Sequence, residues 1–341
     1  MRRLLLAVPM IGCLLFAQSA TELRDSVGLA GEPRKAAFVE NYLVTANESN
    51  LAIIDLTNGL TVRHLPQGSL VEDFEASPAG HLMAVGTCDH AIQIWDTNSW
   101  TLVRRFALQQ ECAESVSFSP DGALLATGAY GCASNEAIQV WDVSRGKLTA
   151  EIAPGTGFRN VVFGGNGSWI AGVDDKGMAT VFAWPSGQKL RTFVGLDHAG
   201  SGNFRFISSP DGRYLAWAGE SLRVWDLISG KELQLPGEPR DKRRSPHGIL
   251  VVNPGQKPAI HPSTAEFLSD GRLAYADEMH GQLVTIQLSN GTTSAQPLIQ
   301  SGEVMFGDVG YRKPQEWLRI RRDGKLIAGT IETRTVARRC W

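Results

Sequence analysis

The feature that most constrains this chain is a repeated unit of just over forty residues, which is most complete at 115–143. That stretch reads as a strand, a tight turn, a second strand, a loop and a third strand. Its turn is Ser119-Pro120-Asp121-Gly122, in which proline fixes φ, aspartate can bond its own backbone and glycine accepts a positive φ. Val116 and Phe118 alternate with polar neighbours before the turn, which is typical of a strand.

Versions of this unit recur along the chain when it is aligned on the third strand. They lie at about 33–64, 70–106, 115–152, 157–194, 202–235, 263–298 and from about 315 onwards. The steps between the equivalent residues Asp55, Asp96, Asp142, Ala183 and Asp226 are 41, 46, 41 and 43 residues. A period of this size with four strand signals predicts a propeller blade. We therefore predict an all-β fold: a single β-propeller of seven four-stranded antiparallel blades, with strands named a to d from the inside outwards.

The two ends of the chain predict how the ring closes. The last unit stops at its third strand, around 335–341, while residues 21–29 precede the first unit and have no blade of their own. We expect this N-terminal strand to join the C-terminal blade as its outer strand. Closure of this kind limits the open sheet edges through which propellers could aggregate.

Three units carry a tryptophan-aspartate pair at the end of the third strand. The pairs are Trp95-Asp96, Trp141-Asp142 and Trp225-Asp226, and Pro-Asp-Gly turns occur at 120–122 and 210–212. With these motifs the chain resembles the WD40-repeat β-propeller family over about 33–341. The resemblance implies the fold and a structural role for the six paired residues, but it does not specify a function.

Residues 1–19 have the pattern of a secretory signal peptide. Arg2 and Arg3 precede an apolar run at 4–16, and Ala17-Gln18-Ser19 fits a small-x-small cleavage site. We therefore expect a secreted or periplasmic protein whose propeller occupies 20–341, with no membrane association after cleavage. The alternatives are an uncleaved membrane anchor and a lipoprotein signal that ends at Cys13.

The composition and motifs favour a non-catalytic protein without a cofactor or metal. Cleavage would remove two arginines and no acid, so the formal net charge would move from −2 to −4, which gives no case for nucleic acid as a partner. The sequence holds no Gly-x-Ser-x-Gly elbow, His-Glu-x-x-His, Cys-x-x-Cys or phosphate loop. We expect a monomeric scaffold that binds a protein or peptide. The alternative is an enzyme or small-molecule-binding protein with a site at the mouth of the central channel.

Four cysteines remain after the predicted cleavage: Cys88, Cys112, Cys132 and Cys340. An exported chain can keep disulfides. A hairpin that turns at Pro120-Asp121 brings the region of Cys112 opposite that of Cys132, so Cys112–Cys132 is the predicted bridge. The alternative is that all four are small buried thiols.

Two features break the regular period and are candidates for partner binding. An insertion at 236–262, between the fifth and sixth units, carries the cluster Arg240, Lys242, Arg243 and Arg244, which suits an acidic partner or a phosphate surface. Its alternative is a solvated loop. Trp100 occupies a turn where other units have small polar residues, so we expect either an exposed interface residue or a side chain folded back over its own blade.

We expect the binding surface to be the face that carries the loops from strand d to strand a and the turns between strands b and c. In the repeat alignment this face gathers Glu72, Asp73, Glu114, Tyr130, Arg159, Arg205 and the insertion.

Overall fold

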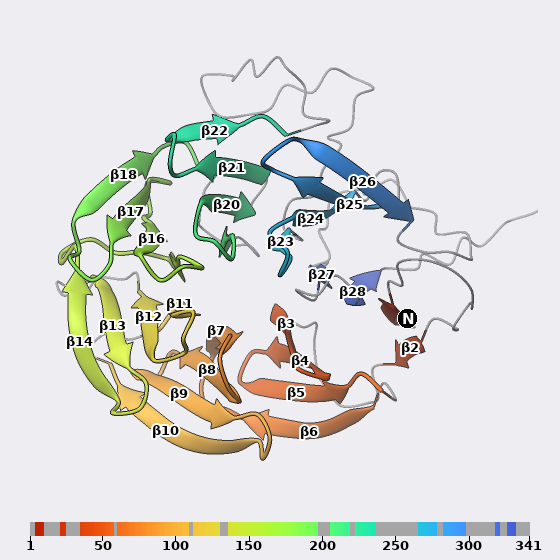
Figure 1. Cartoon of the computed structure of the whole chain (residues 1–341). Coiled ribbons are helices and arrows are strands. Elements are labelled where there is room, and N and C mark those ends of the chain that lie inside the picture. The colour runs from red at the N-terminus through yellow and green to blue at the C-terminus, as the bar shows by residue number, and fades with distance from the viewer. Residues whose placement is uncertain are drawn as a thin grey trace, which may run out of the picture.

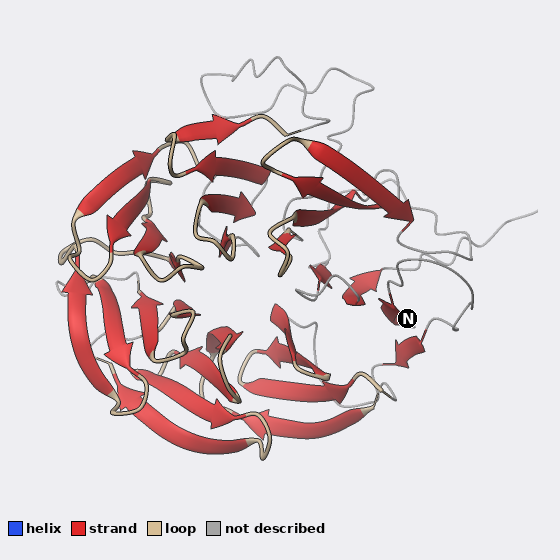
Figure 2. Ribbon diagram, in the orientation of Figure 1, coloured by secondary structure: helices blue, strands red, loops and turns tan. Residues whose placement is uncertain are grey.

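A computed structural model of the chain describes most of the repeated region and two short segments near the start. The described residues are 4–9, 21–24, 35–57, 60–108, 112–129, 136–196, 205–218, 222–235, 265–277, 282–297, 318–320 and 326–331. Figure 1 shows their strands arranged around a common centre, and Figure 2 shows strands joined by loops and turns. None of these residues forms a helix long and apolar enough to cross a membrane.

Six sheets are blades of four consecutive antiparallel strands, and they confirm the first six predicted units. The first blade comprises β3 (Lys35–Val39), β4 (Tyr42–Asn47), β5 (Asn50–Asp55) and β6 (Thr61–Pro66). The second comprises β7 (Val71–Ala76), β8 (Leu82–Thr87), β9 (Ala91–Asp96) and β10 (Thr101–Ala107). The third comprises β11 (Ser115–Phe118), β12 (Leu124–Gly128), β13 (Ile138–Asp142) and β14 (Lys147–Ile152).

The remaining three blades follow the same order from the inner to the outer strand. The fourth comprises β15 (Asn160–Phe163), β16 (Trp169–Val173), β17 (Ala179–Ala183) and β18 (Lys189–Phe193). The fifth comprises β19 (Arg205–Ser208), β20 (Tyr214–Ala218), β21 (Leu222–Asp226) and β22 (Lys231–Leu233). The sixth comprises β23 (Glu266–Phe267), β24 (Leu273–Asp277), β25 (Gln282–Gln287) and β26 (Thr292–Pro297).

The prediction of seven such blades is wrong, because only six are continuous in sequence among the described residues. A further sheet takes strands from both ends of the chain, in the order β2 (Thr21–Arg24), β1 (Leu4–Pro9), β28 (Leu326–Ile331) and β27 (Leu318–Ile320). The place next to β28, predicted for a strand at 335–341, is taken by β1, whose Leu4 pairs with Ile331. Residues 335–341 lie outside the described part of the chain.

The a-to-b turns owe their shape to the Ser-Pro-Asp-Gly sequence. In the third blade Ser119 Oγ donates to Asp121 (2.6 Å) and accepts from the Leu124 amide (2.9 Å). The fifth blade repeats both bonds with Ser209, at 2.6 and 2.9 Å. Gly122 has a φ of +69°, in the left-handed region that favours glycine. The same local sequence therefore builds the same turn twice.

The hydrophobic core lies between blades rather than inside them. Each of five clusters of buried side chains draws on two consecutive blades, from the first and second to the fifth and sixth. A four-stranded sheet has two faces to bury, so each blade relies on its neighbours for stability. This stacking holds the connecting loops in fixed relative positions.

Candidate functional site

One edge of the propeller carries the loops that enter each strand a and the turns between strands b and c; we call it the loop face. Glu72 and Asp73 lie at the start of β7, and Glu114 and Arg159 come just before β11 and β15. Arg205 is the first residue of β19. The repeat alignment therefore placed these five residues on one edge, and their role in partner binding stays a prediction.

Ion pairs on the loop face join neighbouring blades and the loops that enter them. The three pairs are Lys35–Asp73 (3.1 Å), Arg159–Glu114 (3.9 Å) and Arg205–Glu266 (2.6 Å). Arg205 also donates to the Ala265 carbonyl at 2.8 Å, so its guanidinium ties the fifth blade to the sixth. Arg159 and Arg205 thus have partners within the chain, and this fixes where the face presents their charge.

Acidic side chains near these pairs also bond the backbone of the next blade. Asp73 Oδ2 accepts from the Val116 amide at 3.0 Å, and Glu75 accepts from the Phe118 amide at 2.8 Å. Both amides belong to β11, so the carboxylates hold strands β7 and β11 together. Hydrogen bonds to charged groups are stronger than neutral ones, so these two bonds strengthen the junction between the second and third blades.

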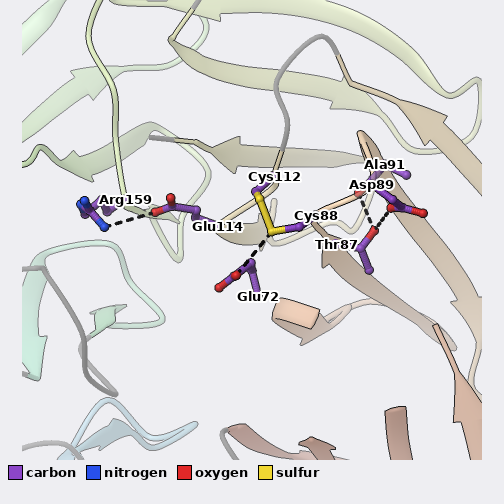
Figure 3. Close-up of a disulfide and its surroundings, with 8 residues drawn as sticks. All are labelled: Glu72, Thr87, Cys88, Asp89, Ala91, Cys112, Glu114 and Arg159. Carbon is purple, nitrogen blue, oxygen red and sulfur yellow. Dashed lines mark hydrogen bonds and ion pairs between the residues drawn. A yellow bond between two sulfur atoms is a disulfide. The ribbon is translucent and has the colours of Figure 1, made fainter. Parts of the chain in front are cut away.

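Glu114 is the carboxyl group on this face with the clearest shift in pKa. Burial raises the pKa of Glu114 to about 7, and the nearby charge of Glu72 adds to the rise. Arg159 opposes the shift, but its guanidinium is 3.9 Å away, too far to offset the loss of hydration. Figure 3 shows Glu114 facing Arg159, with Glu72 beside the disulfide. A carboxyl group with a pKa near 7 can change its charge at neutral pH.

Glu114→Gln should raise stability at about pH 8 and leave it nearly unchanged at about pH 4. The folded pKa of about 7 exceeds the ordinary value of 4.5, so the folded state binds the proton more tightly than the unfolded chain. The stability that protonated Glu114 contributes is fully present below about pH 4.5 and is lost as the pH rises through about 7. Glutamine stays neutral over the whole range. Thermal unfolding of both proteins across this range measures the effect. A constant difference in melting temperature at every pH would contradict it.

The disulfide differs from the predicted one. Cys112 bonds to Cys88, with 4.0 Å between their Cα atoms, so the predicted Cys112–Cys132 bridge is wrong. The physical reason is that the segment before β11 lies against the end of β8, where the Ala113 amide donates to the Thr87 carbonyl at 3.2 Å. Cys132 and Cys340 lie outside the described residues.

Trp100 is buried and is not an exposed interface residue. Its side chain is only 6% exposed and packs edge-to-face on Tyr42 of the first blade, with 5.5 Å between the ring centres. The backbone φ of +53° at Trp100 turns the indole back over the blades, and Arg63 donates to the Ser99 carbonyl beside it at 2.9 Å. Trp100 therefore belongs to the core between the first two blades.

Several predicted partner-binding residues fall outside the part of the chain that the structure describes. They are Tyr130 and the basic cluster Arg240, Lys242, Arg243 and Arg244, together with the rest of the insertion at 236–262. Their roles stay predictions from the sequence.

The tryptophan-aspartate pairs serve the structure. Each aspartate organises the turn from strand c to strand d: Asp96 accepts from the Ser99 amide at 2.7 Å and Asp142 from the Arg145 amide at 2.8 Å. Hydrogen bonds from Ser144 and the Arg145 backbone lower the pKa of Asp142 to about 2. Trp141 stacks on Phe106 of the preceding blade, with 5.8 Å between the ring centres. The structural role implied by the resemblance agrees with these contacts.

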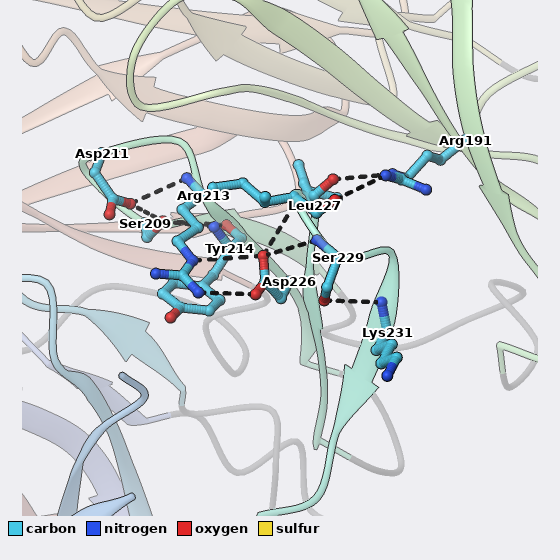
Figure 4. Close-up of polar contacts among 10 residues, drawn as sticks. Arg191, Ser209, Asp211, Arg213, Tyr214, Asp226, Leu227, Ser229 and Lys231 are labelled. Carbon is cyan, nitrogen blue, oxygen red and sulfur yellow. Dashed lines mark hydrogen bonds and ion pairs between the residues drawn. The ribbon is translucent and has the colours of Figure 1, made fainter. Parts of the chain in front are cut away.

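A groove that the sequence did not predict lies between the fourth and fifth blades, at the edge opposite the loop face. Its volume is about 260 Å³, and Trp169, Leu190 and Ile228 line it among others. Arg191 bonds the carbonyls of Leu227 and Ile228 at 2.9 and 3.0 Å, and Arg213 pairs with Asp226 at 2.9 Å (Figure 4). These arginines come from different blades, so no local sequence motif would have found the groove.

Comparison with known proteins identifies one repeat directly. The family described as "WD domain, G-beta repeat" matches residues 102–142. This range begins in β10, the outer strand of the second blade, and ends with β13 of the third. The sequence repeat is therefore offset from the structural blade: it combines the outer strand of one blade with the first three strands of the next.

Three curated proteins match parts of the chain. They are Pre-mRNA-processing factor 19 of Oryza sativa subsp. japonica (26% identity, 39% of this chain and 25% of the relative), Striatin homolog of Dictyostelium discoideum (27%, 36% and 16%) and Dihydro-heme d1 dehydrogenase of Pseudomonas aeruginosa (28%, 28% and 19%). The chain thus spans a quarter or less of the length of these relatives. Their names indicate different activities, which agrees with a shared fold that hosts several functions.

Proposed function

This chain is a WD40-like β-propeller, and from that premise we propose that it is a non-catalytic scaffold that binds a protein or peptide through its loop face. The proposal includes export, with residues 1–19 as a cleaved signal peptide. Support for a protein partner comes from the matches to Pre-mRNA-processing factor 19 and Striatin homolog, neither of which is named as an enzyme.

The observation that carries the proposal is the mixed and fixed charge of the loop face. Acidic and basic side chains on it form pairs that bridge neighbouring blades, such as Lys35–Asp73 and Arg205–Glu266. Charges held in fixed positions can be matched by opposite charges on a protein partner, and such complementarity sets register and specificity. A rigid surface also reduces the entropy lost on binding.

The test begins with cross-linked capture of a partner from the native envelope or secretion fluid, followed by affinity measurement with the purified pair. The double variant Glu48→Lys/Asp175→Lys reverses two exposed charges in the b-to-c turns of the first and fourth blades. We expect binding to weaken roughly tenfold or more, about 1.4 kcal/mol. A variant lacking residues 240–244 tests whether the insertion contributes.

The matched control reverses exposed charges at the opposite edge of the ring. Arg145→Glu/Lys231→Glu changes the turn between strands c and d of the third blade and the first residue of strand d in the fifth, and it should leave the affinity unchanged. If this control loses binding and the loop-face variant retains it, the partner binds at the edge opposite the loop face, which would contradict the proposal. Failure of the folded protein to capture any partner would overturn the scaffold proposal.

The second candidate function is a small-molecule or enzymatic site at the channel mouth. It is favoured by the match to a protein named Dihydro-heme d1 dehydrogenase and by the carboxyl group of Glu114, whose pKa of about 7 suits proton transfer. A thermal-shift screen of small molecules distinguishes this function. A ligand that stabilises the wild type but not Glu114→Gln would favour it over the scaffold.

We also propose that the sheet formed by β2, β1, β28 and β27 closes the ring. Its strand β27 contacts both β3 of the first blade and β24 of the sixth. Cleavage after residue 19 would remove β1, and we propose that residues 335–341 then take the place next to β28.

Deletion of residues 334–341 should therefore lower the melting temperature of a chain that starts at residue 20 more than that of the full-length chain. The full-length chain keeps β1 as the neighbour of β28, whereas the shorter chain would leave that edge unpaired. Thermal unfolding of the four proteins measures the difference. An equal effect of the deletion in both backgrounds would contradict this account of closure.

A further inference from the structure

Glu72, Cys88 and Cys112 meet on the loop face in an arrangement that suits a metal ion. One carboxylate oxygen and the two sulfur atoms all lie within 4.8 Å of one another, and all three side chains are half-buried. Figure 3 shows the three side chains converging at the disulfide. Glu72 Oε1 lies 3.4 Å from Cys88 Sγ. A disulfide sulfur has no hydrogen to donate, so this contact is not a hydrogen bond and the carboxylate gains no proton from it.

The backbone aims Glu72 at the sulfur atoms. The register between β7 and β8 shifts between Val71 and Asp73, which makes Glu72 the extra residue of a β-bulge. Bulges re-aim side chains and are enriched next to functional sites. The carboxylate is therefore directed by the fold rather than by a flexible loop.

The two cysteines are held together by more than their covalent bond. The Cys88 amide donates to the Leu70 carbonyl at 3.0 Å, and the Ala113 amide donates to the Thr87 carbonyl at 3.2 Å. Gly86 permits this close approach, since a Cβ atom there would lie 2.4 Å from the Ala113 carbonyl oxygen. These contacts keep both thiols close to Glu72 after the disulfide is opened.

We propose that the reduced form of this group, Cys88, Cys112 and Glu72, is a binding site for a divalent zinc-type ion. Zinc accepts thiolate and carboxylate ligands together, and three protein ligands leave the fourth tetrahedral position for water. Opening the site requires a dithiol reductant, which becomes a cyclic disulfide and passes two electrons and two protons to the cysteines. The ion then replaces both thiol protons, which go to solvent. The disulfide and the metal site are thus alternative states of one group.

The test uses Co²⁺, a spectroscopic stand-in for zinc, with the full chain in which Cys13, Cys132 and Cys340 are replaced by serine. The protein is reduced with a dithiol, freed of it by gel filtration under nitrogen and titrated with Co²⁺. We expect one equivalent to bind with absorption bands of thiolate-to-cobalt charge transfer and tetrahedral coordination. The oxidised protein should show neither band.

Substitutions identify the ligands. Glu72→Gln should weaken Co²⁺ binding at least tenfold while both thiolates remain, since the loss of even an outer partner of a ligand costs that much. Cys88→Ser removes one of the two thiolates and should at least halve the charge-transfer absorbance. Glu48→Gln, an exposed acid in the b-to-c turn of the first blade, should leave the titration unchanged. Circular dichroism of each reduced variant confirms that it is folded.

Two results would overturn the proposal. One is a reduced, folded protein that binds no Co²⁺. The other is binding that Glu72→Gln and Glu48→Gln leave equally strong, which would show adventitious coordination by thiols alone. Neither result bears on the capture of a protein partner, so the two proposals fail separately.

Discussion

Replacing Trp225 by alanine should lower the free energy of unfolding by about 3–5 kcal/mol. Its side chain is 2% exposed and belongs to the cluster between the fourth and fifth blades. The indole stacks on Phe193 of the neighbouring blade, with 4.9 Å between the ring centres. The Arg223 guanidinium lies 4.9 Å from the centre of the Trp225 ring. Alanine would lose these contacts and leave a cavity between two blades. Denaturant unfolding followed by circular dichroism measures the loss.

The equivalent residue of the second blade provides a matched comparison. Trp95 occupies the same place in the repeat but is only partly buried, and Trp100 shares the same cluster. Trp95→Ala should therefore cost clearly less than Trp225→Ala, and Trp225→Phe should fall between them. Equal losses for the two alanine variants would show that position in the repeat, rather than burial, sets the contribution of these tryptophans.

The sequence predicted the parts of the fold that depend on neighbours along the chain. In the third and fifth blades the first turn lies where its sequence predicts it, because Ser119 and Ser209 form their turns with residues two and five positions away. The loop-face positions of Arg159 and Arg205 followed from the same period. Local hydrogen bonding and a fixed repeat length are sufficient for this level of description.

Contacts between distant segments explain what the sequence did not predict. The indole of Trp100 is covered by Tyr42, 58 positions earlier, which the repeat pattern of a single blade does not reveal. The strand β1 pairs with β28 from the other end of the chain, although its sequence reads as a signal peptide. The groove beside Arg191 and Arg213 arises where two blades meet. Each of these features depends on packing in three dimensions, and the blade count was wrong for the same reason.

The disulfide is another contact between distant segments of the chain. Its removal is the second change that we expect to lower the free energy of unfolding strongly. Loop closure between Cys88 and Cys112 spans 24 positions, and a loop of that length gives about 3 kcal/mol by restricting the unfolded chain. Cys88→Ser should therefore lower the free energy of unfolding by about that amount under oxidising conditions. Because the backbone bonds of Cys88 and Ala113 remain, we expect a folded protein with a lower unfolding midpoint.

The partner of Cys112 determines which cysteine substitution lowers the stability of the oxidised protein. Cys132 would be its natural partner if pairing followed the hairpin alone, because Ser115 and Gly128 face each other across β11 and β12. Pairing with Cys88 instead fastens the loop that enters the third blade onto the second, so the bridge stabilises the junction between blades rather than one hairpin. Cys132→Ser should then leave the unfolding midpoint of the oxidised protein unchanged, and reduction should bring the wild type to the level of Cys88→Ser. A large loss in Cys132→Ser with none in Cys88→Ser would restore the hairpin bridge, and it would remove the basis for a metal site at Glu72.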